Sequence, residues 1–556
     1  MDFRLILIAA LPAAIVTAPD PVEASAAGAA APRRPNIVLI LADDLGFSDI
    51  GSFGGEIPTP HIDALAERGV KFSEFYNTAR CWPSRAALMS GLYPHQVGLG
   101  GELQYRRPDG AVVPPPNRSG PYQGFFSSGT PNLAERLKSI GYKTYMTGKW
   151  HLGDVDVGSW PTRRGFDQYF GPVTGTDSYF STGVDPARAR KYVMNETEWP
   201  VPTTGFYATT AFTDKAAEFI KRSTSEDPSS PFFLYVAYTA PHWPLHALPA
   251  DIARQNGAYD KGWDAIRTER WRRARALGLI SDRHVLPPRP ANVPPWSAIT
   301  EKDRWADRME VYAAQIDAMD QGIGRIVKAL RDNRRFDDTI ILFLSDNGGT
   351  EEDLADRPST ARFNDPFSPP GSRTRFEAYT RRWAFVSNTP YQGYKVAMGE
   401  GGVRTPFVVH WPAGIRSPGR TSRQVGHIID LAPTLLSLAG ERKPPVAAEG
   451  ENLAADIMRP RRARERTLYF EHLGNRAVRQ GSWKLVMNAG QPWRLYHLAS
   501  DPTELRNLVA ARPEMRAMLI ASWERWAARV GVQGFAGRDP KGPHGRSPAR
   551  VGGRGG

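Results

Sequence analysis

The sequence predicts an α/β protein, with a large, mainly parallel sheet sandwiched by helices and a smaller C-terminal α+β part built on a short antiparallel sheet. Three observations predict this fold. Unbroken apolar runs of strand length stand at 35–42 and 339–345, as expected of parallel strands that are buried on both faces. Helical patterns alternate with such runs. After about residue 460 the pattern changes to short segments separated by turn residues.

The individual elements follow from the same patterns. The predicted strands of the large sheet are 35–42, 142–146, 232–238, 339–345 and 406–410. The predicted helices between them are 59–67, 130–139, 207–221, 303–331 and 428–439. In the C-terminal part we expect strand segments at 466–471, 477–486 and 493–498, closed by a helix over 513–530.

The chain divides into four parts on composition. Residues 1–26 combine a basic start, an apolar stretch of about 12 residues and an Ala24-Ser25-Ala26 cleavage pattern, which is a secretory signal and too short for a membrane anchor. An α/β domain over 33–460 and an antiparallel-sheet subdomain over 461–533 follow. The tail over 534–556 is rich in Gly, Pro and Arg and is expected to be disordered. The protein is therefore predicted to be exported, to the periplasm or the extracellular space.

Charge and cysteine content narrow the classes of function. The chain has 556 residues, 71 Lys and Arg against 58 Asp and Glu, and hence a formal net charge of +13. This excess favours anionic partners. Because the sequence has no zinc-finger spacing, basic zipper or RNP-like string, nucleic-acid binding is not predicted. A single cysteine excludes an internal disulfide.

Two predicted strands end in pairs of polar residues. Asp43 and Asp44 follow the first strand, and Asp346 and Asn347 follow the strand at 339–345. Ligand sites in open α/β sheets lie at the carboxyl ends of the strands, so these side chains are expected to converge. They offer only oxygen atoms, which favours Ca²⁺ or Mg²⁺ over zinc. The alternative is that each pair is simply a polar strand end.

The only cysteine stands in the string Cys81-Trp82-Pro83-Ser84-Arg85. Pro83 suits the first turn of a helix, which places Cys81 where helix amides favour an anion. Arg85 follows four residues later on the same helix face and is able to hold an anionic oxygen. A lone cysteine is otherwise a small buried hydrophobe. A thiolate nucleophile is disfavoured, because no local cysteine-protease signature is present.

Three further strings carry cations and imidazoles. Lys149 and His151 lie two residues apart in T-G-K-W-H-L-G, on one side of a segment expected to be extended. His242 follows the strand at 232–238 and is suited to donate a proton at neutral pH. Lys395 precedes an E-G-G string. His246 is interpreted as a surface or substrate-pocket histidine rather than a catalytic one.

These strings together resemble those of the formylglycine-dependent (type I) sulfatases of the alkaline phosphatase superfamily, bacterial arylsulfatases in particular, from the first strand to about residue 500. The resemblance implies that a formylglycine-generating enzyme oxidises Cys81 to an aldehyde during maturation. It also implies one divalent cation, Ca²⁺ first and Mg²⁺ second. The implied metal ligands are Asp43, Asp44, Cys81, Asp346 and Asn347. Two-metal relatives often carry histidine where Asn347 stands, so a single ion is expected.

The chain departs from the family pattern at two places. Ser90-Gly91-Leu92 stands where Thr-Gly-Arg is frequent, and Tyr394 precedes Lys395 where glycine is common. The first departure affects contacts at the end of the helix rather than the oxidation of the cysteine. Glu400 and Arg404 are expected to be structural and to fix the loop that carries Lys395.

The resemblance implies hydrolysis of sulfate monoesters, aryl sulfates foremost. A hydroxyl of the aldehyde hydrate at position 81 attacks sulfur, and the second hydroxyl allows sulfate to be expelled with return of the aldehyde. The implied roles are charge stabilisation by Arg85, Lys149 and Lys395, protonation of the leaving alcohol by His242, and proton removal from the hydrate by His151. Two alternatives stay open: a formylglycine-dependent phosphodiesterase or phosphonate monoester hydrolase, and a non-catalytic binder of sulfated glycans.

The segment over 251–305 holds four tryptophans and many arginines. It is either a lid that stacks on aryl or sugar rings, or a helical insertion that packs on the main domain. The sequence does not specify which sulfate ester is the substrate.

Overall fold

A computed structural model describes residues 34–106, 111–115, 120–175, 178–180, 192–354, 364–441 and 449–534. The predicted signal peptide lies outside these residues, as does the predicted tail apart from Gly534. Within the described residues, no helix combines the length and the apolar character that crossing a bilayer requires.

The main sheet has ten strands in the order β13-β2-β12-β11-β1-β10-β6-β7-β8-β9. Its centre, from β11 through β1, β10 and β6 to β7, is parallel, and antiparallel strands flank it on both sides. The predicted fold class is therefore confirmed. The strands are β1 (Asn36–Ala42), β2 (Val70–Phe72), β6 (Lys143–Gly148), β7 (Gln168–Pro172), β8 (Tyr192–Met194), β9 (Thr197–Glu198), β10 (Phe232–Ala237), β11 (Thr339–Ser345), β12 (Phe407–His410) and β13 (Arg420–Ser422).

Helices and smaller sheets surround this centre. The helices are α1 (Pro60–Glu67), α2 (Cys81–Ser90), α3 (Leu133–Ser139), α4 (Ala208–Glu226), α5 (Pro249–Ala253), α6 (Gly262–Ala276), α7 (Lys302–Asp332), α9 (Thr380–Ser387), α10 (Glu400–Val403), α11 (Leu431–Leu438), α12 (Ala454–Met458) and α13 (Pro513–Val530). The remaining strands are β3 (Phe75–Tyr76), β4 (Tyr105–Arg106), β5 (Val112–Val113), β14 (Gly426–His427), β15 (Thr467–His472), β16 (Asn475–Gln480), β17 (Trp483–Met487) and β18 (Arg494–His497).

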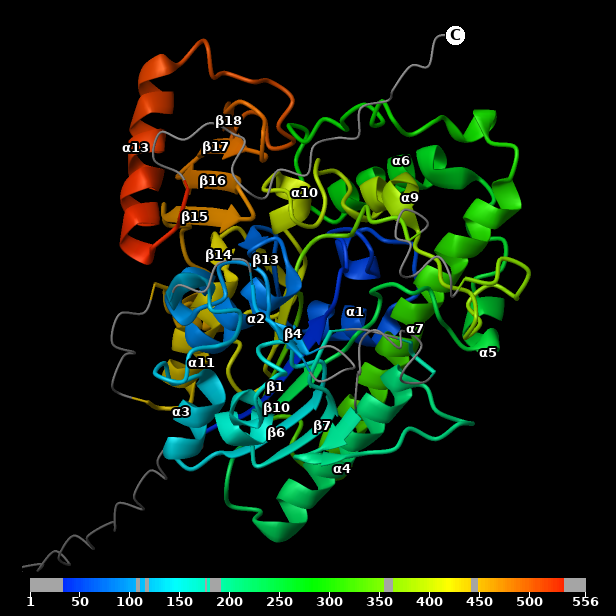
Figure 1. The fold of residues 1–556 in the computed structure, drawn as a ribbon, viewed down its shortest axis with the longest axis vertical. Helices are drawn as coiled ribbons and strands as arrows, with labels where there is room; N and C mark the ends of the chain where they lie inside the picture. Colours follow the sequence, from blue (N-terminus) through cyan, green and yellow to red (C-terminus); the bar gives the residue numbers. More distant parts are fainter. Residues whose placement is uncertain are drawn as a thin grey trace, which may run out of the picture. The chain divides into compact units, whose positions relative to one another are not determined.

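Helices lie on both sides of the sheet (Figure 1), and a hydrophobic cluster covers each face. Val38 and Ile40 of β1 face one cluster, to which α1, α4 and α7 contribute. Ile37 and Leu39 face the other, which includes residues of α2, α3 and α11. Because side chains alternate along a strand, a strand that packs on both faces must be apolar at every position. This is why the predicted strands read as unbroken apolar runs.

The register of the central strands brings their carboxyl ends to one level. Ala42 of β1 pairs with Ser345 of β11, and Ala237 of β10 pairs with Gly148 of β6. Leu41 pairs with Ala237 and so joins the two pairs. The residues that follow each strand therefore emerge at the same edge, where the sequence predicts a ligand site.

The C-terminal segments form an antiparallel sheet in the order β15-β16-β17-β18, and the predicted helix over 513–530 is α13. One expectation is wrong: the segment 477–486 is a hairpin, not a single strand. Gln480 and Trp483 pair across a two-residue turn in which Gly481 has a φ of +55°. Glycine adopts this left-handed conformation without steric cost, so it permits the reversal. The boundary near residue 460 stays a prediction.

The segment over 251–305 packs against the main part of the chain. Trp263 is fully buried and meets the rings of Trp296, Trp305 and Trp383 at centroid distances of 4.7, 6.3 and 5.7 Å. Arg270 of α6, also fully buried, forms an ion pair of 2.6 Å with Asp49 in the loop that follows β1. These contacts support the packed insertion rather than a lid of stacking tryptophans.

A buried ionic cluster joins the C-terminal sheet to the segment that carries Lys395. Lys484 of β17 lies 2.7 Å from Glu400 of α10 and 3.0 Å from Glu504, and its side chain has no solvent exposure. Glu400 also accepts hydrogen bonds from Tyr76 and from Arg404. The structural role predicted for Glu400 and Arg404 agrees with these contacts.

Replacing Lys484 by methionine removes the cation between two buried carboxylates. We expect the free energy of unfolding to fall by ~3–5 kcal/mol, because a buried charge left without its partner is strongly destabilising. Urea denaturation measures the change. Lys328→Met, at an exposed pair with Asp332 on α7, is the control and is expected to change stability little. Equal effects of the two substitutions would contradict this account of the cluster.

Candidate active site

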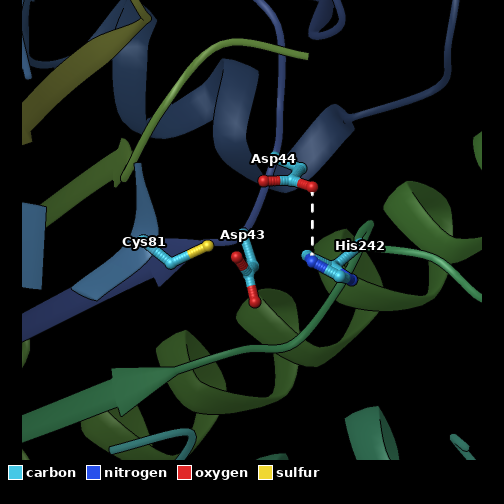
Figure 2. A group of neighbouring side chains, drawn as sticks. All are labelled: Asp43, Asp44, Cys81 and His242. Carbon is cyan, nitrogen blue, oxygen red and sulfur yellow. Dashed lines mark ion pairs between the residues drawn. The ribbon is translucent and has the colours of Figure 1, made fainter. Parts of the chain in front are cut away.

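Four potential ligand groups meet at the carboxyl edge of the sheet (Figure 2). They belong to Asp43, Asp44, Cys81 and His242, and one ligand atom of each lies within 4.8 Å of those of the others. The two aspartates follow β1, Cys81 begins α2, and His242 lies in the loop after β10. All four side chains are buried. The set therefore includes His242, which the sequence predicts at the carboxyl edge of a strand as a sulfate-binding residue and proton donor, not as a metal ligand.

Cys81 is the first residue of α2, as Pro83 predicts, and Arg80 is the residue before the helix. Burial raises the pKa of its thiol to about 12, although the nearby Lys149 and Lys395 act in the opposite direction. The thiol is therefore protonated at neutral pH when no ion is bound. This weighs against an unmodified thiolate as the nucleophile.

Each carboxylate at this edge is paired with a buried cation. The Nζ atom of Lys149 lies 2.6 Å from Asp43, and that of Lys395 lies 2.8 Å from Asp44. Burial acts to raise the pKa of Asp43, but Lys149, His242 and Arg85 outweigh it and hold that pKa well below its ordinary value. A third aspartate, Asp346, lies beside these two. When all three are ionised, their negative charges are balanced by the positive charges of Arg85, Lys149 and Lys395.

The guanidinium of Arg85 holds the third aspartate. Its Nε and Nη2 atoms donate to one oxygen of Asp346 at 3.1 and 2.8 Å, and Nη1 donates to the carbonyl of Lys149 at 2.9 Å. Three of its donors are thus used within the protein. We infer that Arg85 positions Asp346 and Lys149, whereas its predicted contact with a sulfate oxygen stays a prediction.

Asp346 and Asn347 lie beside Asp44. Asp346 accepts a hydrogen bond of 3.3 Å from the Asp44 amide, and the Asn347 amide group donates to Asp44 at 2.6 Å. Burial, reinforced by Asp43, raises the pKa of Asp346 to about 7. Oδ1 of Asn347 is buried and has no hydrogen-bond partner among the described residues. An unpartnered buried oxygen next to carboxylates fits a hard cation.

His242 faces the same carboxylates with one ring nitrogen. Its Nδ1 lies 2.6 Å from the carbonyl of Trp243, which assigns the proton to that atom. Nε2 is then an acceptor, 3.2 Å from Nζ of Lys395 and 3.5 Å from Asp44. Burial lowers the pKa of His242 to about 4, with Lys395 acting in the same direction and Asp44 against it. His242 is therefore neutral at pH 7.

The other two histidines predicted from the sequence, His151 and His246, are not among the four ligand groups that meet at this edge. His151 has a φ of +62°, so the extended geometry expected for Lys149 to His151 is wrong: β6 ends at Gly148, before either residue. Its ring lies edge to face with Trp82 at 5.5 Å. His246 is fully buried rather than on the surface and lies 3.2 Å from Ser178 through Nδ1.

Arg80, which directly precedes Cys81, is a residue that the sequence reasoning did not single out. Its guanidinium stacks on the ring of Trp82, with the carbon Cζ 4.3 Å from the ring centroid. The signal was present in the string R-C-W, where a cation and an aromatic ring flank the cysteine.

Comparisons with known proteins agree with this geometry. The family model described as "Sulfatase" matches residues 35–441, and the one described as "N-sulphoglucosamine sulphohydrolase, C-terminal" matches residues 394–526. The chain is 34% identical to "Arylsulfatase" of Klebsiella aerogenes over 80% of its length and 96% of that protein. It is 28% identical to human "N-acetylgalactosamine-6-sulfatase", over 78% of this chain and 67% of that one. Among solved structures, Ps i-CgsB in complex with k-i-k-neocarrahexaose superposes with a TM-score of 0.65 at 27% identity, covering 89% and 93% of the two chains.

The raised pKa of Cys81 predicts slow alkylation. In protein whose Cys81 has not been oxidised and whose divalent ions have been removed by a chelator, we expect iodoacetamide at pH 8 to label the native thiol at least ~1000-fold more slowly than the thiol in denaturant. A thiol with a pKa near 12 is almost entirely protonated at this pH, whereas a free thiol with a pKa of about 8.5 is not. Similar labelling rates in the two states would show that the thiol is accessible and ionised.

Proposed function

The chain belongs to the sulfatase family, and on this premise we propose that it hydrolyses sulfate monoesters of small organic alcohols, aryl sulfates foremost, with Cys81 converted to formylglycine and one divalent cation bound beside it. One observation carries the proposal: the only cysteine, at the start of a helix, lies within 4.8 Å of Asp43, Asp44 and His242. The Lys149 and Lys395 ammonium groups pair with those two aspartates and so lie at the same place.

The proposed cation ligands are the oxygen atoms of Asp43, Asp44, Asp346 and Asn347, together with the modified residue at position 81. An all-oxygen set favours Ca²⁺, with Mg²⁺ second. The unpartnered Oδ1 atom of Asn347 supports this assignment. When bound, the cation would supply positive charge next to the reacting group.

The chemistry of formylglycine explains why a plain cysteine is not sufficient. The hydrate of the aldehyde carries two hydroxyl groups, one to attack sulfur and one to allow sulfate to leave with return of the aldehyde. With the cation held by Asp43 and Asp44, the ammonium groups of Lys149 and Lys395 would be available to donate to the sulfate oxygens. Arg85 keeps Asp346 and the Lys149 backbone in place through its three hydrogen bonds.

His242 is proposed to protonate the leaving oxygen, with His151 assisting proton removal at residue 81. In the resting protein His242 is neutral, because burial and Lys395 lower its pKa to about 4. An anionic substrate entering beside Nε2 raises that pKa, since a nearby negative charge favours the imidazolium. The acid is therefore formed when substrate is bound.

The proposed cellular location is outside the cytoplasm, in the periplasm or beyond. It rests on the signal sequence predicted over residues 1–26 and on the exported context that this implies. Conversion of Cys81 by a formylglycine-generating enzyme would then precede or accompany export.

Mass spectrometry of the tryptic peptide 81–85 tests the modification. We expect a mass about 18 Da below that of the cysteine form, because a CH₂SH group is replaced by an aldehyde. Cys81→Ala and Cys81→Ser should each lower kcat for 4-nitrophenyl sulfate by at least ~1000-fold, since neither provides two hydroxyls on one carbon. An unmodified thiol in fully active enzyme would refute the mechanism.

Comparing two substrates of the same enzyme distinguishes a sulfatase from a phosphonate hydrolase. We expect kcat/KM for 4-nitrophenyl sulfate to exceed that for 4-nitrophenyl phenylphosphonate by at least ~100-fold, about 2.7 kcal/mol in transition-state stabilisation. The reverse preference would favour the formylglycine-dependent phosphonate monoester hydrolase. Binding of sulfated compounds without hydrolysis of any would favour a non-catalytic function.

Removal of the cation provides a test that does not depend on turnover. After chelation, adding Ca²⁺ at about one hundred times its dissociation constant should raise the free energy of unfolding by about 2.7 kcal/mol. Asn347→Leu should weaken this effect, because it removes the unpartnered oxygen while keeping a similar volume. Arg222→Gln, at an exposed pair with Glu226 on α4, is the control. Full Ca²⁺ stabilisation in the Asn347 variant would contradict the assigned ligand set.

A further inference from the structure

Arg80 differs in its pairing from Arg85 and from other arginines of the described chain. Four of those arginines form ion pairs with acidic side chains: Arg85 with Asp346, Arg381 with Glu351, Arg404 with Glu400 and Arg479 with Glu74. For Arg80, no hydrogen bond or ion pair of the guanidinium links it to any residue that the structure describes, and its Nε atom is buried without a partner.

The guanidinium of Arg80 is nevertheless held in a fixed place. It stacks on Trp82 at 4.3 Å, and the indole N–H of Trp82 donates to the carbonyl of Gly101 at 2.7 Å. Trp82 is buried, and its ring packs edge to face against His151 and His472 at 5.5 and 5.6 Å. Stacking over a rigid ring leaves the in-plane N–H groups of a guanidinium able to bind a planar or tetrahedral anion in bidentate fashion.

A buried histidine that packs against Trp82 adds no negative charge to this pair. His472 is fully buried, and burial, together with the charges of Arg80 and His95, keeps its pKa well below the ordinary value. Its ring is therefore neutral and does not compete for the arginine. The charge of Arg80 is left for a ligand.

Arg80 directly precedes Cys81, so consecutive Cα atoms place them about 3.8 Å apart along the backbone. The reacting sulfate already has two lysines, Lys149 and Lys395, at the carboxylates beside Cys81. A further cation next to the same residue exceeds what a single sulfate ester group requires. A second anionic group on the same substrate molecule would meet it.

We propose that Arg80, stacked on Trp82, binds a second anionic group of the substrate, a carboxylate or a second sulfate, and that the preferred substrates are sulfate esters with two anionic groups. This inference rests on the proposed sulfate ester hydrolysis and names the substrate class of the same site. In this proposal Arg80 is a specificity-determining residue.

Two matched pairs of substrates test the inference with the mature, cation-loaded enzyme. Phenyl sulfate is compared with 4-carboxyphenyl sulfate, and N-acetylglucosamine 6-sulfate with glucosamine 2-N,6-O-disulfate. The second substrate of the first pair carries an added carboxylate, and that of the second pair carries an added sulfate. The two pairs therefore distinguish whether Arg80 binds a carboxylate or a sulfate. The readout is the ratio of kcat/KM for the doubly charged ester to that for its singly charged partner.

In the wild type we expect this ratio to be at least tenfold in one pair or both. In Arg80→Gln this ratio should fall at least tenfold, mainly through KM. Arg80→Lys should give an intermediate ratio, because lysine keeps the positive charge but lacks the paired N–H groups that bind an anion in bidentate fashion. Arg325→Gln, on α7 in an exposed pair with Asp214 of α4, is the matched control and should keep the wild-type ratio. Thermal unfolding of each variant checks that it is folded.

A purely structural role for Arg80 would lower both rates of a pair and leave their ratio unchanged, and this result would overturn the inference. A wild-type ratio near one in both pairs would also overturn it, while leaving the proposed hydrolysis intact. Wild-type enzyme that cleaves none of the four esters would instead refute the proposed function, and the inference with it.

Discussion

The site depends on one electrostatic constraint: three carboxylates are brought together, out of water, at the end of parallel strands. Asp43, Asp44 and Asp346 would repel one another strongly without compensation, because a low-dielectric interior screens charge poorly. In the structure Lys149, Lys395 and Arg85 provide that compensation. With all three carboxylates ionised, the proposed divalent ion would make the site doubly positive, which would suit an anionic ester and its dianionic product.

Other parts of the structure hold these six charged side chains in position. Arg85 belongs to the helix that begins with Cys81, so Cys81, the proposed nucleophile position, and the third carboxylate are both tied to one rigid element. The loop of Lys395 is fixed by backbone hydrogen bonds, from its own amide to Gly349 and from Val396 to Ala79. The C-terminal sheet adds Lys484, which pairs with Glu400 in the segment that carries Lys395. A region that carries none of the proposed catalytic groups thereby contributes to their geometry.

The sequence predicted most of the fold because strand burial on both faces leaves an unmistakable apolar run, as in β1 and β11. The convergence of Asp43 with Asp44 and Cys81 followed from motif strings and from the rule that strand ends share an edge. The hairpin at Gly481 was missed because apolar residues continue on both sides of a short turn. The partner of Arg85 was not predictable, since pairing over more than 200 residues of separation leaves no local pattern. For the same reason the sequence could not indicate that Arg80 has no ion-pair partner among the residues that the structure describes.

The account is tested most directly by a crystal structure of the mature protein with bound cation, using anomalous scattering to identify the ion and the electron density to identify residue 81. It predicts one ion contacted by oxygens of Asp43, Asp44, Asp346 and Asn347, next to a residue 81 that has lost its sulfur. An intact thiol at that position, or an ion held by His242 with Asn347 turned away, would contradict it.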